Sequence, residues 1–122
     1  MFRVVEMGEE IELGMEAPAV ELFRVEGRGP ELGPLARHVR TPQLLAPMDG
    51  GRWGMWLAPP GDSPLDPTWH ELSGDQAILL DRGTWHRGPV PLDGEAGSYL
   101  TVEAPHTNRD DFVEAEPLHS GS

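Results

Sequence analysis

The sequence contains no cysteine and no lysine, and these two absences exclude several kinds of chemistry. Without cysteine there can be no disulfide, no thiolate ligand for a metal and no cysteine nucleophile. Without lysine there can be no Schiff base and no lysine acting as a general base. All nine basic residues are arginines, so any basic side chain that clamps an anionic ligand must be a guanidinium.

Positive charge is scarce, and long apolar runs are missing. The chain has 21 acidic and nine basic residues, for a formal net charge of -12. Such a surface repels phosphate backbones and anionic lipid headgroups, so we expect neither nucleic acid nor a membrane surface as a partner. No window is apolar enough to predict a signal sequence or a transmembrane helix, and we expect a cytoplasmic protein.

Glycine and proline are abundant and evenly spread. The 122 residues include 15 glycines and 13 prolines, while hydrophobic residues make up 38%. Scattered turn residues divide the chain into many short elements, and no helical periodicity is sustained. The sequence therefore predicts one all-β domain over residues 1–122. Residues from about 106 onward predict a mobile tail without chemistry of its own.

Several strands can be read from the pattern of apolar residues. Residues 19–26 are β-prone and end in a glycine-rich turn. In residues 35–40, a period of two places Ala36, His38 and Arg40 on one face. Residues 53–58 predict a further strand with a tryptophan on each face.

Residues 98–104 alternate between apolar and polar side chains, as is typical of a half-buried strand. The pattern predicts that Leu100, Val102 and Ala104 face inward and that Tyr99, Thr101 and Glu103 face solvent.

The stretch from Gly74 to His86 is the most informative part of the chain. A short apolar run at 76–80 predicts a buried strand, Gly83 predicts a tight turn, and His86 follows directly after Trp85. This order places an imidazole beside an aromatic wall. A single histidine is more often a structural residue than a functional one, and we interpret His70 in that way. A second histidine, His38, makes a functional pair with His86 the preferred interpretation.

The spacing around both histidines resembles the two motifs of the cupin family, which are small β-barrels. Gly74, Gly83 and His86 are similar to the second motif, and Ala36, His38, Gln43 and Gly50 match the spacing of the first. The resemblance implies a cupin jelly-roll barrel. The metal-binding cupins use three histidines and a carboxylate, of which His38 and His86 remain here. With Gln43 as the only other candidate ligand, we expect weak metal binding or none, and no cofactor.

Within the cupins, the chain more closely resembles the ureidoglycolate lyase family. The sequence Arg82-Gly83-Thr84-Trp85-His86 is similar to a family signature, as are residues 35–38 and 42–45. The resemblance covers residues 19–104. It implies a carbon–nitrogen lyase that splits ureidoglycolate, a small carboxylate, into glyoxylate and urea. That reaction belongs to allantoin degradation within purine catabolism.

The residues can be assigned roles in such a reaction. His38 and His86 would serve as base and acid, because they alone titrate near neutral pH in the expected barrel interior. Arg40 and Arg82 are the candidates that would bind the substrate carboxylate. Gln43 would bind the urea amide or the hydroxyl. Trp56 and Trp85 would wall the pocket, or would simply belong to the core.

Two other functions stay open on the sequence. One is a cupin that binds a small acid or sugar without converting it. The other is a metal-dependent cupin enzyme with an incomplete ligand set. Metal content after purification distinguishes the metal-dependent enzyme from the lyase and the binding protein. A thermal-shift screen of small carboxylates distinguishes a binding site from an inert barrel.

The resemblance, and the frequency of closed two-fold assemblies among soluble proteins, predict a homodimer. Light scattering at micromolar concentration should return about twice the chain mass of 13.4 kDa. A mass close to that of a single chain would contradict this prediction.

Overall fold

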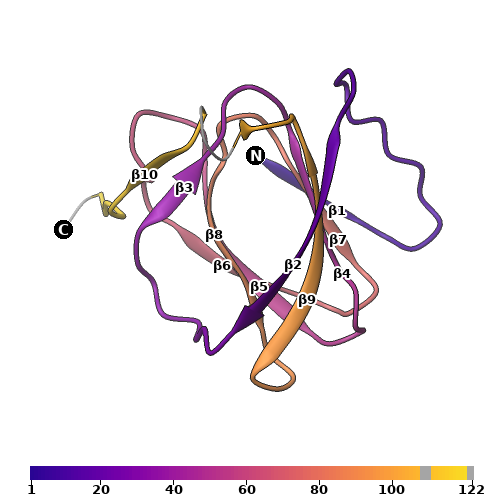
Figure 1. Cartoon of the computed structure of the whole chain (residues 1–122). Coiled ribbons are helices and arrows are strands. Elements are labelled where there is room, and N and C mark those ends of the chain that lie inside the picture. Colours follow the sequence, from indigo (N-terminus) through magenta and orange to yellow (C-terminus); the bar gives the residue numbers. More distant parts are fainter. Residues whose placement is uncertain (108–110, 121–122) are drawn as a thin grey trace.

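The computed structural model describes residues 1–107 and 111–120. Across these residues the chain forms ten β-strands (Figure 1). They are β1 (Phe2–Val5), β2 (Ala19–Glu26), β3 (Leu35–Arg37), β4 (Gln43–Pro47), β5 (Trp53–Ala58), β6 (Thr68–Leu72), β7 (Ala77–Leu80), β8 (Trp85–Pro91), β9 (Ala96–Glu103) and β10 (Val113–Ala115).

The strands build two antiparallel sheets of five strands each. Their orders are β1-β7-β4-β9-β2 and β10-β3-β8-β5-β6. Figure 1 shows the two sheets curving around a common interior, with β2 and β9 on one side and β3 and β8 on the other. This architecture confirms the expected all-β, cupin-type barrel. No helix among the described residues has the length and apolar character needed to cross a bilayer.

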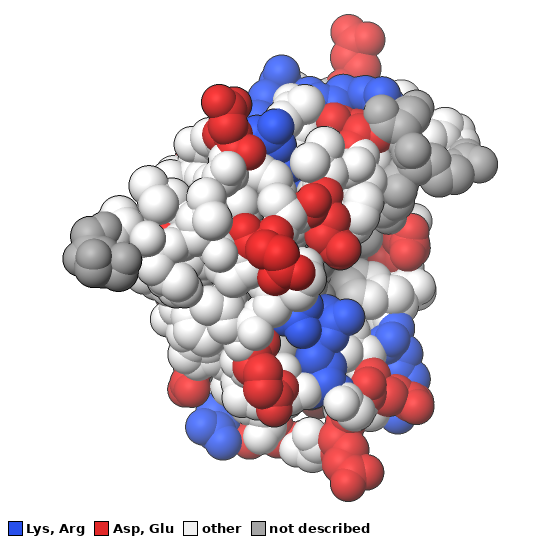
Figure 2. Space-filling model, turned by 90° about the vertical axis from the view of Figure 1, so that its left-hand side faces the viewer, with Lys and Arg blue, Asp and Glu red and all other residues white. Residues whose placement is uncertain are grey.

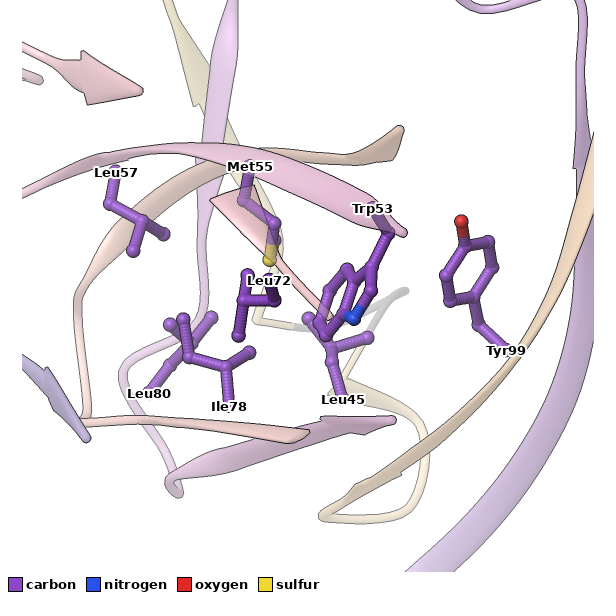
Figure 3. Close-up of a cluster of buried hydrophobic side chains, with 8 residues drawn as sticks. All are labelled: Leu45, Trp53, Met55, Leu57, Leu72, Ile78, Leu80 and Tyr99. Carbon is purple, nitrogen blue, oxygen red and sulfur yellow. The ribbon is translucent and has the colours of Figure 1, made fainter. Parts of the chain in front are cut away.

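The apolar core lies between the inner faces of the two sheets. Figure 3 shows its side chains pointing toward one another from strands of both sheets. The ring centroids of Trp53 on β5 and Tyr99 on β9 are 5.7 Å apart and join the two layers. Each fully buried large apolar side chain contributes roughly 1.5–3 kcal/mol. The buried cluster consists of Leu45, Trp53, Met55, Leu57, Leu72, Ile78, Leu80 and Tyr99.

The predicted facing of β9 is wrong. Tyr99, Thr101 and Glu103 point into the barrel and are 2%, 4% and 5% exposed, respectively. The alternation is real, but the outward residues of this sheet are apolar as well, as Leu100 and its β2 partner Leu22 show. With apolar residues on both faces, alternation alone does not identify the inner one.

Part of the segment after residue 106 is paired with the barrel. Strand β10 pairs antiparallel with β3, with Glu114 opposite Ala36. The carboxylate of Asp111 accepts hydrogen bonds from the backbone N–H groups of Val39 and Arg40, at 3.0 and 2.7 Å. The composition of this segment is typical of loops, which is why the short strand was not predicted.

Two glycines of the cupin-like motifs lie against each other. Gly50 ends the first motif-like stretch, Gly74 begins the second, and their backbones touch. A Cβ atom added at Gly74 would overlap the backbone oxygen of Gly50. The turn after β4 and the turn before β7 can therefore pack together only where a side chain is absent.

Replacing Gly74 by alanine should lower the free energy of unfolding by about 1–3 kcal/mol, because two backbone segments must move apart. Gly61→Ala is the matched control, since a Cβ there meets only the backbone oxygen of Ser63 at 3.9 Å. Urea denaturation of both variants measures the difference. Equal stabilities for the two variants would refute the packing argument.

Candidate active site

A cavity of about 430 Å³ opens between the sheets, beyond the apolar core. Its polar lining comes from several strands that are distant in sequence, and this is the arrangement expected of a ligand site. The polar groups that converge on the cavity include His38, Gln43, His86, Thr101 and Glu103.

The two histidines come together as their spacing predicts. Ala36 on β3 is paired with His86 on β8, which brings the residue following β3 next to that strand. The ring centroids of His38 and His86 are 5.5 Å apart. The two residues are 6% and 9% exposed. A single small ligand can therefore touch both rings.

His86 is held in one tautomer. Its Nδ1 lies 3.2 Å from the backbone oxygen of Thr84. Because a carbonyl can only accept, Nδ1 carries the hydrogen and Nε2 is left as the proton acceptor. Burial, assisted by the proximity of His38, lowers the pKa of His86 to about 4. The ring is therefore neutral near pH 7 and can accept a proton.

His38 lies between an aromatic ring and a carboxylate. Its ring centroid is 5.8 Å from that of Phe112, and its Nε2 is 3.9 Å from Oε2 of Glu103. Burial lowers the pKa of His38, and the charge of Asp111 partly offsets that effect. The backbone of Thr107 and Asp111 also approaches the ring, but Nδ1 forms no hydrogen bond of ordinary geometry within the described residues.

Gln43 lines the cavity and has an unused acceptor. Its Nε2 donates to the hydroxyl oxygen of Thr101 at 3.1 Å, which fixes the orientation of the amide. Its Oε1 is buried and has no hydrogen-bond partner among the described residues. An unsatisfied buried acceptor is costly, so this oxygen is suited to bind an N–H or O–H group of a ligand.

Neither arginine predicted to bind a carboxylate lines the cavity. Arg40 and Arg82 are both exposed. Strand β3 ends at Arg37, so the alternation that placed Arg40 beside His38 does not extend that far. The arginines that line the cavity are Arg28 and Arg87. The Arg87 side chain donates to two backbone oxygens of residues 31–34, whereas Arg28 is exposed at the cavity.

The two tryptophans do not wall the cavity either. Trp85 precedes the inward-facing His86, so it lies on the opposite face of the sheet, where it packs with Leu35 and Ala58. Trp56 packs against this outer cluster, and its Nε1 donates to the backbone oxygen of Pro30 at 2.8 Å. The aromatic residues that line the cavity are Phe23 and Phe112.

Glu103 is the group that sequence reasoning missed, because β9 was assigned the opposite face. It adds a carboxylate to the donors that a metal ion could find near His38 and His86. However, in the part of the chain that the structure describes, no three His, Cys, Asp or Glu side chains are arranged to hold an ion. Weak metal binding stays a prediction.

Other hollows lie outside the barrel cavity, and Arg24, Glu26 and Glu95 line one of them. A second hollow, of about 560 Å³, is lined mainly by apolar groups such as Met1, Leu65 and Leu118 and contains no histidine. Figure 2 shows the side of the molecule that bears β3 and β10. Acidic side chains are spread across this face, and the arginines lie among them. The barrel cavity is where two buried histidines and a buried carboxyl group converge.

A comparison with models of protein families found a match that covers most of the chain. The family model described as ureidoglycolate lyase matches residues 9–119, which include every cavity residue named above. A comparison with curated proteins found no match.

The shifted pKa of His86 predicts a pH-dependent stability. Folding lowers this pKa from 6.5 to about 4, so the unfolded chain takes up the proton first as the pH falls. The stabilisation is complete above pH 6.5 and is lost on acidification toward pH 4, a change of about 3 kcal/mol.

In the variant His86→Gln, the side chain at position 86 cannot take up a proton, so this loss of stability on acidification should be absent. Urea denaturation across the range measures the difference in unfolding free energy between the wild type and the variant. That difference should change by about 3 kcal/mol between the two pH limits. Curves that stay parallel would show that His86 is not buried in its neutral form.

Proposed function

The chain belongs to the ureidoglycolate lyase family, and on that premise we propose that it cleaves ureidoglycolate into glyoxylate and urea. The reaction is an elimination. The hydroxyl of the substrate loses a proton, the bond between that carbon and the urea nitrogen breaks, and the nitrogen gains a proton. A base, an acid and groups that orient the substrate are therefore required.

The observation that carries the proposal is the pair of buried imidazoles facing one cavity. His86 is the base, because its Nδ1 hydrogen is directed to Thr84 and its Nε2 is free to accept the hydroxyl proton. A pKa of about 4 describes the empty cavity. A bound carboxylate brings a negative charge that raises the pKa of both rings toward the working pH.

The other groups orient the substrate. The buried Oε1 of Gln43 accepts a hydrogen bond from the urea amide. Arg28, an exposed guanidinium among the lining residues, takes the role that the sequence had assigned to Arg40 and Arg82 and binds the carboxylate. The departing nitrogen takes its proton at His38, whose ring lies 5.5 Å from that of His86.

His86→Ala should lower kcat for urea release by about 10²–10⁴-fold, because the base is lost, while the barrel stays folded. His70→Gln is the control. His70 lies outside the cavity, against Phe2 at 4.7 Å between ring centroids, so this variant should keep the wild-type rate. A coupled assay for urea or glyoxylate at neutral pH measures both variants.

Two results would count against the proposal. If the wild-type protein at high concentration releases no product from ureidoglycolate, the lyase function is wrong and binding without turnover takes its place. If it does release product but His86→Ala retains most of the rate, the reaction is right and the base is wrong.

A further inference from the structure

The loop that carries Arg28 is built from residues that give it little rigidity of its own. The 27–34 loop joins β2 to β3, and in Figure 1 it runs from the lower end of β2 up to β3. It contains three glycines and two prolines, and Arg28 stands between Gly27 and Gly29. Glycine leaves the backbone many conformations, and proline has no N–H to donate. The position of Arg28 therefore depends on contacts that the loop receives from other elements.

Two neighbouring side chains of one sheet supply such contacts. Arg87 on β8 and Trp56 on β5 are paired across the strands. Arg87 donates from Nε to the backbone oxygen of Glu31 at 3.1 Å and from Nη1 to that of Pro34 at 3.2 Å. Trp56 donates from Nε1 to the backbone oxygen of Pro30 at 2.8 Å. Three carbonyl groups of the loop are thus bound by side chains of the barrel.

The loop also fits closely around the guanidinium. Gly33 lies directly against Arg87, and a Cβ atom added at Gly33 would be 2.9 Å from Cζ of Arg87. Leu32 packs against the outer cluster that contains Leu35 and Trp85. A guanidinium presents its donors in a planar fork, so two bound carbonyl groups fix its orientation. The loop is therefore held on Arg87 by packing as well as by hydrogen bonds.

The charges in the cavity make the position of Arg28 important for an anionic ligand. Glu21, Glu103 and Glu114 line the same cavity. Ionised carboxylates repel a substrate carboxylate, and the repulsion is strong where water is partly excluded. Arg28 and Arg87 bring positive charge to this cavity. Because two nitrogens of Arg87 are bound to the loop, the exposed Arg28 is the better suited of the two to bind a carboxylate.

We propose that Arg87 is a positioning residue. Together with Trp56 it holds the 27–34 loop against the barrel and so keeps Arg28 at the cavity, where Arg28 binds the substrate carboxylate. This assignment rests on the lyase function proposed above. Arg87 acts through Arg28, so its contribution is to substrate binding, whereas its neighbour His86 takes part in proton transfer.

Arg87→Gln should raise KM for ureidoglycolate about tenfold, because Arg28 must then be ordered when the substrate binds. The change in kcat should be smaller, since His38 and His86 stay in place. Trp56→Phe keeps an aromatic ring and removes only the indole N–H. It should raise KM in the same direction and by less, although Trp56 does not line the cavity.

Arg52→Gln and Trp69→Phe are the matched controls. Arg52 donates to the Asp93 carboxylate at 3.0 and 2.8 Å, and Nε1 of Trp69 donates to the Glu71 carboxylate at 3.3 Å. Each control loses the same kind of donor as its test variant, but that donor does not reach the 27–34 loop. Both controls should keep the wild-type KM and kcat.

A double-mutant cycle distinguishes positioning from direct binding. Arg28→Gln removes the group through which Arg87 acts. Adding Arg87→Gln to Arg28→Gln should therefore raise KM by less than about twofold. If Arg87 bound the carboxylate itself, or acted only through its charge, the effects of the two substitutions would multiply.

NMR relaxation of the backbone amides tests the loop without substrate. The order parameters of Gly29, Leu32 and Gly33 should fall in Arg87→Gln and stay at the wild-type values in Arg52→Gln. If Arg87→Gln does not fold, Trp56→Phe takes its place in this measurement and in the cycle with Arg28→Gln.

The two proposals fail in different ways. If the wild-type protein releases no urea, the cycle is measured on glyoxylate binding by calorimetry. A loss of affinity in Arg87→Gln that disappears in the Arg28→Gln background would then show that the lyase function is wrong and that the positioning role stands. The positioning role is overturned if Arg87→Gln keeps the wild-type KM or order parameters, or if the two effects multiply. It is also overturned if the wild-type protein binds neither ureidoglycolate nor glyoxylate.

Discussion

The packing of Trp53 against Tyr99 is the contact on which the rest of the barrel depends. These rings, 5.7 Å apart between centroids, hold the two sheets at a fixed separation from within the apolar core. Along β9 the inward side chains then change from Tyr99 to Thr101 to Glu103. Apolar packing at one end of the barrel thus keeps a polar cavity open at the other. The cost of burying polar groups there is offset by contacts among them, such as the bond from Gln43 to Thr101.

Much of the fold and part of the site could be predicted from the sequence. Strand β2 begins and ends where its β-prone run and its glycine turn predict. His38 and His86 meet because the motif spacing specifies a strand pairing, and pairing fixes which residues are neighbours across the sheet. Such features depend on turns and on local patterns of apolar residues, both of which are written in consecutive residues.

Other features depend on information that no local pattern contains. Glu103 was assigned to the wrong face because β9 has apolar residues on both sides, so its inner face is defined only by the opposite sheet. Arg40 was placed in the cavity by extending an alternation past the true end of β3. β10 has three residues and is held by pairing with β3 and by the contacts of Asp111, which join segments about 70 residues apart in the chain.

The late position of β10 in the chain separates the completion of the cavity from the formation of the core. Phe112 and Glu114 are cavity-lining residues, yet they are translated after all the other strands of both sheets. The apolar core, by contrast, consists of side chains from β4 to β9 and contains none from β10. The strands that carry the apolar core and the strand that closes the cavity thus come from separate parts of the chain. A chain that ended just short of Asp111 would lack Phe112 and Glu114, and with them one wall of the cavity.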